Sequence, residues 1–397
     1  MKSVRLHHQL IVAAAAVIFA SAPMAQTVKV GVISTYSGFL ARSGEQMEHG
    51  FRLYMKLHAD ELPPGVKVEL IIRDDGGPNP DKGKQLAQEL IVRDKIQFLT
   101  GMMWSPVALA IAPLVTEAKV PMVIMNAAAS IVTTRSPYIV RLSFTEWQHA
   151  YPLGQWASKK YKRAYTLVSD LVPGHDAEEA FSKGFTTGGG EVVGKVRMPV
   201  QNLNYVPFMQ RVKDAKPDVL FAFVNSGVTA SQLMKTYSDL GLAKAGIKLI
   251  GSGNITSDEE LENMGDVALG VITAYHYSVA ADRPANKAFL AALRKEYGDK
   301  EVPSVFTLGG WDGMAAIYAA IRQENGRIDP DKTMEFLRHY KNPNSPRGLI
   351  WIDPETRDVV HNEYIREVRK VGGHLANVEF ETIPNVKDPW KELNLKK

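Results

Sequence analysis

Ser105 is the residue whose type and setting first suggest chemistry. With Pro106 it separates an apolar run (96–101) from a helical pattern over 105–119. A serine followed by proline is a typical helix start, in which the hydroxyl caps free amides and proline occupies the first helical position. The amides of a helix start also bind anions. The sequence therefore leaves three roles for Ser105: a cap, a contact for an anionic ligand, or a nucleophile.

The sequence offers little support for an enzyme. A serine nucleophile needs a base within reach, and the chain has neither a G-x-S-x-G motif nor a base at a recognisable spacing. It also lacks an H-E-x-x-H motif and any Cys, so the usual zinc motifs are missing. Adjacent Asp74 and Asp75 end a predicted strand, where neighbouring side chains point to opposite faces. We therefore expect no catalytic residue, no metal and no cofactor.

The N-terminus predicts export from the cytoplasm. Lys2 and Arg5 precede an apolar run over 10–20, the pattern of a secretory signal peptide, and that run is too short to span a membrane. We place cleavage after Ala25, which removes two positive charges from the formal net charge of +4 and leaves +2. An uncleaved anchor is the alternative. Because the chain has no Cys, we expect neither a lipid anchor nor a disulfide. From the signal peptide we expect a periplasmic location.

Short apolar runs alternate with helical patterns along the rest of the chain. We predict strands over 28–34, 66–75, 96–101 and 120–126, and helices over 43–60, 81–94 and 105–119. The pattern then restarts, with strands over 163–170, 191–199, 217–225 and 247–253 and helices over 176–189, 205–216, 229–241 and 257–265, the last with a capping-box spacing at Ser257 and Glu260. This alternation predicts an α/β fold with two doubly wound units of mainly parallel strands.

Ligands of open parallel sheets bind outside the carboxyl ends of the strands. The loops that follow the predicted strands are rich in small residues, amides and hydroxyls, with a few aromatic residues. Such a mixture suits a pocket with apolar walls and a few polar groups that orient the ligand. The ligand-binding residues predicted on these loops are Tyr36, Ser37, Trp104, Ser105, Ala127, Ala128, Ala129, His175, Asn225, Asn254 and Tyr277.

Several stretches, in their order and spacing, resemble one family. VGVISTYSGFLARSGEQMEHGFRLYM, RDDGGPNPDKGKQLAQELI, GMMWSPVALAIAPLVTEAKVPMV, FMQRVKDAKPDVLFAF and GGWDGMAAIYAAI are similar to the branched-chain amino-acid type of periplasmic substrate-binding protein, which serves ABC importers. The resemblance implies a type I periplasmic binding protein, with two lobes joined by three crossings that close on a ligand like a hinge. Lobe one would hold 26–145 and 276–340, and lobe two 146–275 and 341–397.

The resemblance also implies how a ligand is held. In the family, lobe one grips a carboxylate at the helix after the third strand and at the loop after the fourth, which here are Ser105 and residues 127–130. Amino-acid binders of the family carry an acid in lobe two for the ammonium, where this chain has Asn254. Asparagine cannot neutralise a cation, and burial of an unpaired ammonium is costly. We therefore favour a carboxylate without an α-amine.

The aromatic residues near the predicted mouth point in the same direction. Aromatic faces bury a large area and stack on flat ligands. We therefore expect an aromatic acid, such as a benzoate or a hydroxycinnamate. The residues on which this expectation depends are Tyr36, Phe39, Trp104 and Tyr277. The alternative for Trp104 is that it only packs between a loop and a helix, and for Ser105 that it only caps the helix.

The predicted function is that of an extracytoplasmic solute-binding protein of an ABC importer. We expect a monomer that captures a small carboxylate and docks on an inner-membrane permease. The modest charge, with both signs interspersed, gives no pattern for binding nucleic acid. Three alternatives stay open at this stage: a branched-chain amino-acid-binding protein, a ligand-loaded sensor for a membrane receptor, and a secreted enzyme.

Overall fold

The structure, a computed structural model, describes residues 26–200 and 204–395. The predicted signal peptide, 1–25, lies outside the described residues. Among the helices that are described, none is both long and apolar enough to cross a membrane.

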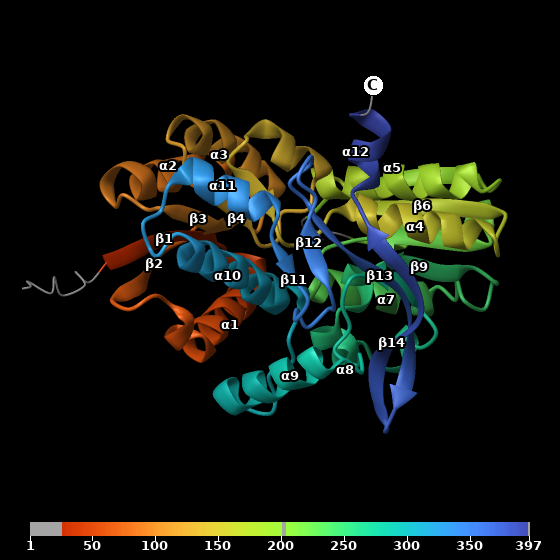
Figure 1. Cartoon of the computed structure of the whole chain (residues 1–397). Coiled ribbons are helices and arrows are strands. Elements are labelled where there is room, and N and C mark those ends of the chain that lie inside the picture. Colours follow the sequence, from red (N-terminus) through yellow and green to blue (C-terminus); the bar gives the residue numbers. More distant parts are fainter. Residues whose placement is uncertain (1–25, 201–203, 396–397) are drawn as a thin grey trace, which may run out of the picture.

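The first lobe is built on a five-stranded sheet whose neighbouring strands are all parallel. The strand order is β2 (Val66–Asp74), β1 (Gln26–Ser34), β3 (Phe98–Gly101), β4 (Met122–Ile124) and β5 (Ile139–Arg141). Figure 1 shows α1 (Ala41–Leu57) and α10 (Val305–Gln323) on one face of this sheet, and α2 (Pro80–Gln88) and α3 (Ser105–Glu117) on the other. Coverage of both faces explains why β1 reads as an almost continuous apolar run.

The second lobe contains a larger, mixed sheet. Its parallel part runs in the order β10 (Ile272–Tyr275), β9 (Lys248–Ser252), β8 (Val219–Phe223), β6 (Arg163–Ser169) and β7 (Glu191–Met198). Its helices include α4 (Glu146–Ser158), α5 (Val172–Thr187), α6 (Val206–Ala215) and α7 (Val228–Asp239). Beyond β10 the sheet continues with antiparallel β13 (Val359–Val371), which also pairs with β14 (His374–Val386). The predicted α/β fold with two lobes of mainly parallel strands is confirmed.

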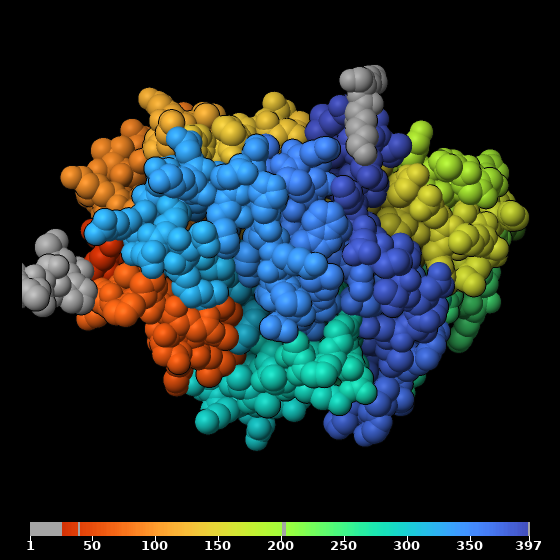
Figure 2. Space-filling view, in the orientation of Figure 1, coloured from red at the N-terminus to blue at the C-terminus, as the bar shows by residue number. Residues whose placement is uncertain are grey.

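Three segments connect the lobes. The first lies between β5 and α4, the second between β10 and α9 (Pro284–Tyr297), and the third follows α11 (Pro330–Arg338) through β11 (Lys341–Asn342) and β12 (Ile350–Ile352) to β13. The C-terminal part packs on both lobes, because Ile350 and Ile352 lie in the core of the first lobe whereas Ile365 and Val368 lie in the cores of the second. In Figure 2 this segment, in blue, runs across the junction between the lobes.

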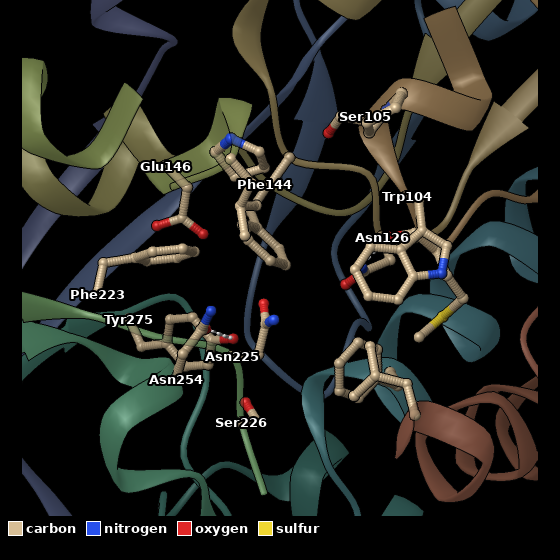
Figure 3. A pocket seen from close by; sticks show the side chains of 17 residues that line it. Trp104, Ser105, Asn126, Phe144, Glu146, Phe223, Asn225, Ser226, Asn254 and Tyr275 are labelled. Carbon is tan, nitrogen blue, oxygen red and sulfur yellow. Dashed lines mark hydrogen bonds between the residues drawn. The ribbon is translucent and has the colours of Figure 1, made fainter. Parts of the chain in front are cut away.

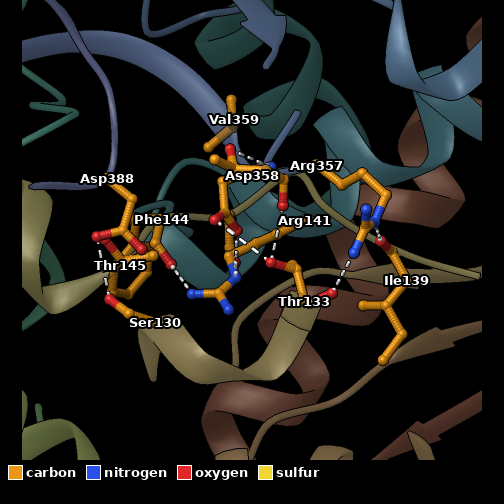
Figure 4. Close-up of polar contacts among 12 residues, drawn as sticks. Ser130, Thr133, Ile139, Arg141, Phe144, Thr145, Arg357, Asp358, Val359 and Asp388 are labelled. Carbon is orange, nitrogen blue, oxygen red and sulfur yellow. Dashed lines mark hydrogen bonds and ion pairs between the residues drawn. The ribbon is translucent and has the colours of Figure 1, made fainter. Parts of the chain in front are cut away.

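Buried polar contacts tie the C-terminal segment to the first crossing (Figure 4). Arg141, which ends β5, donates to the backbone carbonyls of Ala129 at 2.7 Å and Phe144 at 3.2 Å, and its Nε lies 3.3 Å from Asp358 Oδ1. Lys391, in α12 (Pro389–Asn394), forms an ion pair with the same Asp358. These charged groups are almost fully buried, so each depends on the others for a partner.

In the second lobe, one predicted helix has a different start and another is broken. Helix α5 begins at Val172, four residues before the predicted start, with Pro173 in its first turn, so His175 lies in the helix rather than on the predicted loop before it. The predicted helix over 257–265 is divided into a 3-10 turn, Asp258–Glu260, and the single turn of α8 (Leu261–Met264). The side chain of Ser257 makes no capping hydrogen bond there, so the capping-box spacing gave a false signal.

Candidate ligand-binding site

A cavity of about 580 Å³, its open mouth included, lies between the two lobes. The first lobe contributes Trp104, Ser105, Asn126 and Ala128, among others, and the second lobe contributes Phe223, Asn225, Asn254 and Tyr275. Phe144, from the first crossing, and Glu146, at the start of α4, also line the cavity (Figure 3). Of the predicted binding residues, the cavity thus brings together Trp104, Ser105, Ala128, Asn225 and Asn254.

Ser105 is the first residue of α3, and its hydroxyl does not cap the helix. The residue at the N-cap is Trp104, which makes no side-chain capping bond, so the predicted capping role of Ser105 is wrong. Instead, Ser105 Oγ accepts a hydrogen bond of 3.1 Å from the backbone N–H of Ala129. Because the oxygen is used as an acceptor, the hydroxyl proton is left to donate into the cavity. A donor at a helix N-terminus is well placed to meet an anion.

Trp104 forms one wall of the cavity, and its orientation is fixed by hydrogen bonds. Its indole Nε1–H donates to Thr35 Oγ1 at 2.8 Å, and Thr35 Oγ1 donates to Asp75 Oδ1 at 2.7 Å. Trp104 therefore packs between elements and also faces the cavity. Asp75 orients Thr35, and through it the indole ring, so the pair Asp74–Asp75 has a structural use.

Several backbone amides of the loop after β4 form hydrogen bonds within the protein and are therefore not free to bind a ligand. The N–H of Ala127 donates to Met102 O at 2.8 Å, and that of Ala129 donates to Ser105. The next amide, of Ser130, donates across the lobes to Asp176 Oδ2 at 3.0 Å. Ala127 and Ala129 do not line the cavity, whereas Ala128 does. Through the amide of Ala129, the loop positions Ser105.

On the second lobe, Asn254 is oriented as a donor. Its side-chain oxygen accepts a hydrogen bond of 2.7 Å from Tyr275 Oη, which leaves its Nδ2–H groups for the cavity. Asn225 and Ser226 line the same side. Among the described residues that line the cavity, none is Lys or Arg, so a bound carboxylate would be held by neutral donors.

Aromatic rings form much of the remaining wall. Phe223 ends β8, Tyr275 ends β10, and Phe144 lies in the first crossing. The Phe144 and Tyr275 rings meet edge to face, with centroids 5.8 Å apart and an interplanar angle of 62°. Together with Trp104 they give a flat ligand several faces on which to pack.

Glu146 is a buried acid in the cavity that the sequence did not predict as a site residue. Its side chain has no exposed surface, and its Oε2 accepts a hydrogen bond of 2.9 Å from Ser252 Oγ. Burial, and to a lesser extent the charge of Asp176, raises the pKa of Glu146 to about 8. The carboxyl is therefore mainly protonated at neutral pH, when it can both donate and accept a hydrogen bond.

Besides Ala127 and Ala129, four more predicted binding residues lie outside the cavity. Tyr36 and the exposed Ser37 belong to a loop that Asp74 holds, since Asp74 Oδ1 accepts from Tyr36 N at 2.8 Å. His175 Nε2 lies 2.6 Å from Asp170 Oδ1 near the protein surface. Tyr277 is buried elsewhere and donates to Asn286 Oδ1 at 2.9 Å. The structure does not bring these four side chains to the cavity.

The residues that sequence reasoning missed come from strand ends and from the first crossing. Phe223 and Tyr275 are the last residues of their strands, whereas the predictions counted only the loops beyond. A rule that included the final residue of each strand would have found both. Glu146 gives no such signal, because an acid in the first turn of a helix is ordinarily a solvent-exposed partner of the helix dipole.

Two lobes around one cavity define a bilobal solute-binding protein. A family model described as periplasmic binding protein matches residues 27–373, and the chain belongs to this family. Its members are extracytoplasmic binding proteins rather than enzymes. In the described part of the chain, no group of three or more His, Cys, Asp or Glu side chains could hold a metal ion.

The chain is similar over nearly its whole length to several named solute-binding proteins. The Leu/Ile/Val-binding protein homolog 6 of Brucella abortus is 41% identical over 372 residues, which cover 93% of this chain and 95% of the relative. A solute-binding protein of an ABC transporter from Rhodopseudomonas palustris BisB5, solved with 3,4-dihydroxybenzoic acid, is 47% identical with a TM-score of 0.87 and covers 92% of this chain and 99% of its own. Another from R. palustris, solved with 4-hydroxybenzoate, is 42% identical with a TM-score of 0.88, covering 91% and 98%. The predicted family, a periplasmic binding protein of the branched-chain amino-acid transporter type, is confirmed, as is the role of solute-binding protein of an ABC transporter.

Proposed function

We propose that the protein captures an aromatic carboxylate between its lobes and delivers it to an inner-membrane ABC permease. The observation that carries this proposal is the position of Ser105 next to Trp104. The Ser105 hydroxyl can donate a hydrogen bond, and the neighbouring indole ring is fixed in the cavity wall. A neutral donor meets the carboxylate, and the rings of Phe144, Phe223 and Tyr275 cover the flat part of the ligand. Two related proteins solved with dihydroxy- and hydroxybenzoate support this ligand class.

Capture follows from the division of the cavity between the lobes. The ligand first meets the donors of the first lobe, and closure then adds the asparagines and aromatic rings of the second. Closure excludes water and so strengthens the polar contacts. The ligand shifts the open–closed equilibrium only by its differential affinity for the two states. The proposal assigns 26–145 and 276–340 to one moving lobe and 146–275 with most of 341–397 to the other, in a monomer. Within 341–397, β12 would move with the first lobe, because its Ile350 and Ile352 pack in the core of that lobe.

A branched-chain amino acid is the second candidate ligand. The curated relative from Brucella abortus is named for Leu, Ile and Val, and Glu146 supplies an acid that Asn254 could not. To pair with an ammonium, Glu146 would have to lose the proton that burial favours. This requirement separates the two candidates, because amino-acid binding would release a proton.

Calorimetry decides between the two candidates. The full chain is unfolded, dialysed and refolded to remove any bound ligand, and then titrated with 4-hydroxybenzoate, benzoate and leucine. We expect saturable binding of the aromatic acids and no heat with leucine. Binding of leucine without binding of either aromatic acid would contradict the proposal and favour the amino acid.

A further inference from the structure

Glu146 lines the cavity, and one oxygen of its buried carboxyl is unused. Ser252 Oγ holds Oε2, whereas Oε1 is buried and has no hydrogen-bond partner within the described part of the chain. Figure 3 shows the carboxyl beside the rings of Phe223 and Phe144, on the opposite side of the cavity from Ser105 and Trp104. A buried polar atom without a partner costs free energy, so a ligand that supplies the missing partner gains affinity there.

The surroundings of Glu146 favour a neutral partner over a cation. The acidic group that helps to raise its pKa is another carboxyl, Asp176, and no Lys or Arg is among the described residues that line the cavity. Burial keeps the proton on Glu146, whose pKa is about 8. A protonated carboxyl has one donor and spare acceptor capacity, which matches a hydroxyl group, itself both donor and acceptor.

We propose that Glu146 hydrogen-bonds a ring hydroxyl of an aromatic acid whose carboxylate lies at Ser105. This inference rests on the proposed function and deepens it: the ligands of this cavity would be hydroxylated benzoates, and Glu146 would be the residue that selects them over benzoate. The ring would lie between the two polar ends, against Trp104, Phe144 and Phe223. A hydroxyl far from the carboxylate, at the meta or para position, is the one that could reach Glu146.

Asn254 and Asn225 are the competing partners for such a hydroxyl. Both line the same side of the cavity, and Asn254 keeps free Nδ2–H donors. A partly exposed amide can exchange its partner with water, whereas buried Glu146 Oε1 has no partner to exchange. The loss of affinity when the ligand lacks its hydroxyl should therefore depend on Glu146 more than on either asparagine.

The test compares the affinities of 4-hydroxybenzoate and benzoate in three variants. A hydrogen bond to a buried group should make wild type prefer 4-hydroxybenzoate by about 10- to 100-fold. Glu146→Gln, which resembles the protonated acid, should keep most of that preference. Glu146→Leu should reduce it to about 1- to 3-fold, and Glu179→Leu, at an exposed acid of α5, serves as the control and should keep it.

The outcomes separate the two proposals. If Glu146→Leu keeps the full preference while both acids still bind, the assignment of Glu146 is overturned and the proposed function stands. If neither acid binds wild type, the proposed function itself is wrong. If Asn254→Ala abolishes the preference and Glu146→Leu does not, the hydroxyl lies at the asparagine instead.

Counting protons provides a second readout that does not need the leucine variant to fold. Titrations at pH 7 in two buffers with different heats of ionisation give the protons released on binding. With 4-hydroxybenzoate, wild type and Glu146→Gln should release the same number, because Glu146 keeps its proton. A release from wild type that exceeds that of Glu146→Gln by about one proton would mean that Glu146 ionises, and would overturn the proposal.

Discussion

At the scale of single residues, the site orients neutral donors by occupying their acceptor atoms. Ser105 Oγ accepts from Ala129 N, and Asn254 Oδ1 accepts from Tyr275 Oη. Each contact uses the oxygen and leaves hydrogen atoms for a ligand. A carboxylate can thus be held without a buried Lys or Arg, whose desolvation would have to be offset in the empty protein.

Replacement of Ser105 by alanine should weaken the binding of 4-hydroxybenzoate by about 10- to 100-fold, since a hydrogen bond to a charged group contributes about 1.5–3 kcal/mol. The affinity is measured by calorimetry on refolded protein. Ser182→Ala, at a buried serine of α5 outside the cavity, is the control and should bind as wild type does. An unchanged affinity in the Ser105 variant would remove this residue from the site.

The sequence predicted those site residues that follow a strand directly, and it missed those whose role depends on packing. Trp104, Ser105, Asn225 and Asn254 were found because the carboxyl ends of parallel strands meet at one edge. Glu146 was missed because it is buried in the folded protein and its partner, Ser252, is more than a hundred residues away in the sequence. Tyr277 was wrongly included because nothing local shows that the chain turns it toward Asn286.

At the scale of elements, α12 fastens the C-terminal segment to the first lobe. Lys391 forms an ion pair with Asp358, which also lies against Arg141, and Asp388 Oδ1 accepts from Ser130 Oγ at 3.1 Å. Burial lowers the pKa of Lys391 while the nearby carboxylates oppose that effect. The loop after β4, which positions Ser105, is thus held from behind by the end of the chain.

Lys391→Met should lower the free energy of unfolding by about 3 kcal/mol, because it leaves the buried carboxylate of Asp358 with fewer partners. The matched control is Lys370→Met, which removes an exposed ion pair with Asp266 at 2.8 Å and should cost less than about 1 kcal/mol. Urea denaturation followed by circular dichroism measures both changes. Equal losses in the two variants would show that the buried pair adds nothing beyond an exposed one.

The order of elements was predictable, whereas their ends were less so. Apolar runs and helical periodicity gave the strands and helices of both lobes because these signals are local. The early start of α5 and the broken helix after β9 were missed, since proline at a helix start and a capping-box spacing are weak signals in loops. The antiparallel pairing of β13 with β10 joins segments about ninety residues apart, and no local pattern specifies it.

At the scale of the whole molecule, three histidines meet where the chain crosses between the lobes. His149 lies in α4, His276 follows β10, and His361 lies in β13. The ring centroids of His149 and of His361 each lie 5.2 Å from that of His276. The groups that face this cluster are Glu363, which bonds His149 Nδ1 at 3.0 Å, Arg347, Arg366 and the ring of Tyr275.

This cluster should make the protein less stable in acid. Burial, with the nearby arginines, lowers the pKa of His149 and His276 well below the usual value and that of His361 to about 3. The folded state therefore keeps these rings neutral, whereas the unfolded chain binds protons below about pH 6.5. Because the unfolded state then holds more protons, stability falls as the pH drops from about 6.5 toward 5.

His276→Leu should remove one third of this acid sensitivity. Relative to wild type, the variant should gain about 2 kcal/mol in unfolding free energy between pH 7 and pH 5, because one fewer proton is bound on unfolding. Urea midpoints at pH 7, 6 and 5 measure the gain, and His374→Leu, at an exposed histidine, should show no such trend. Buried acids with a raised pKa, such as Glu146, increase the stability of the folded state as the pH falls. The unfolding free energy of the variant must therefore be compared with that of wild type at each pH.

Because the indole of Trp104 is fixed in the cavity wall, ligand binding should change the tryptophan fluorescence of the protein. Trp104 is the one tryptophan among the described residues that line the cavity, and its Nε1–H is anchored on Thr35. An aromatic acid seated against that ring would quench its emission or receive its excitation energy. The unlabelled protein would then report its own occupancy optically, and Trp104→Phe would abolish the signal while the other tryptophans continued to emit.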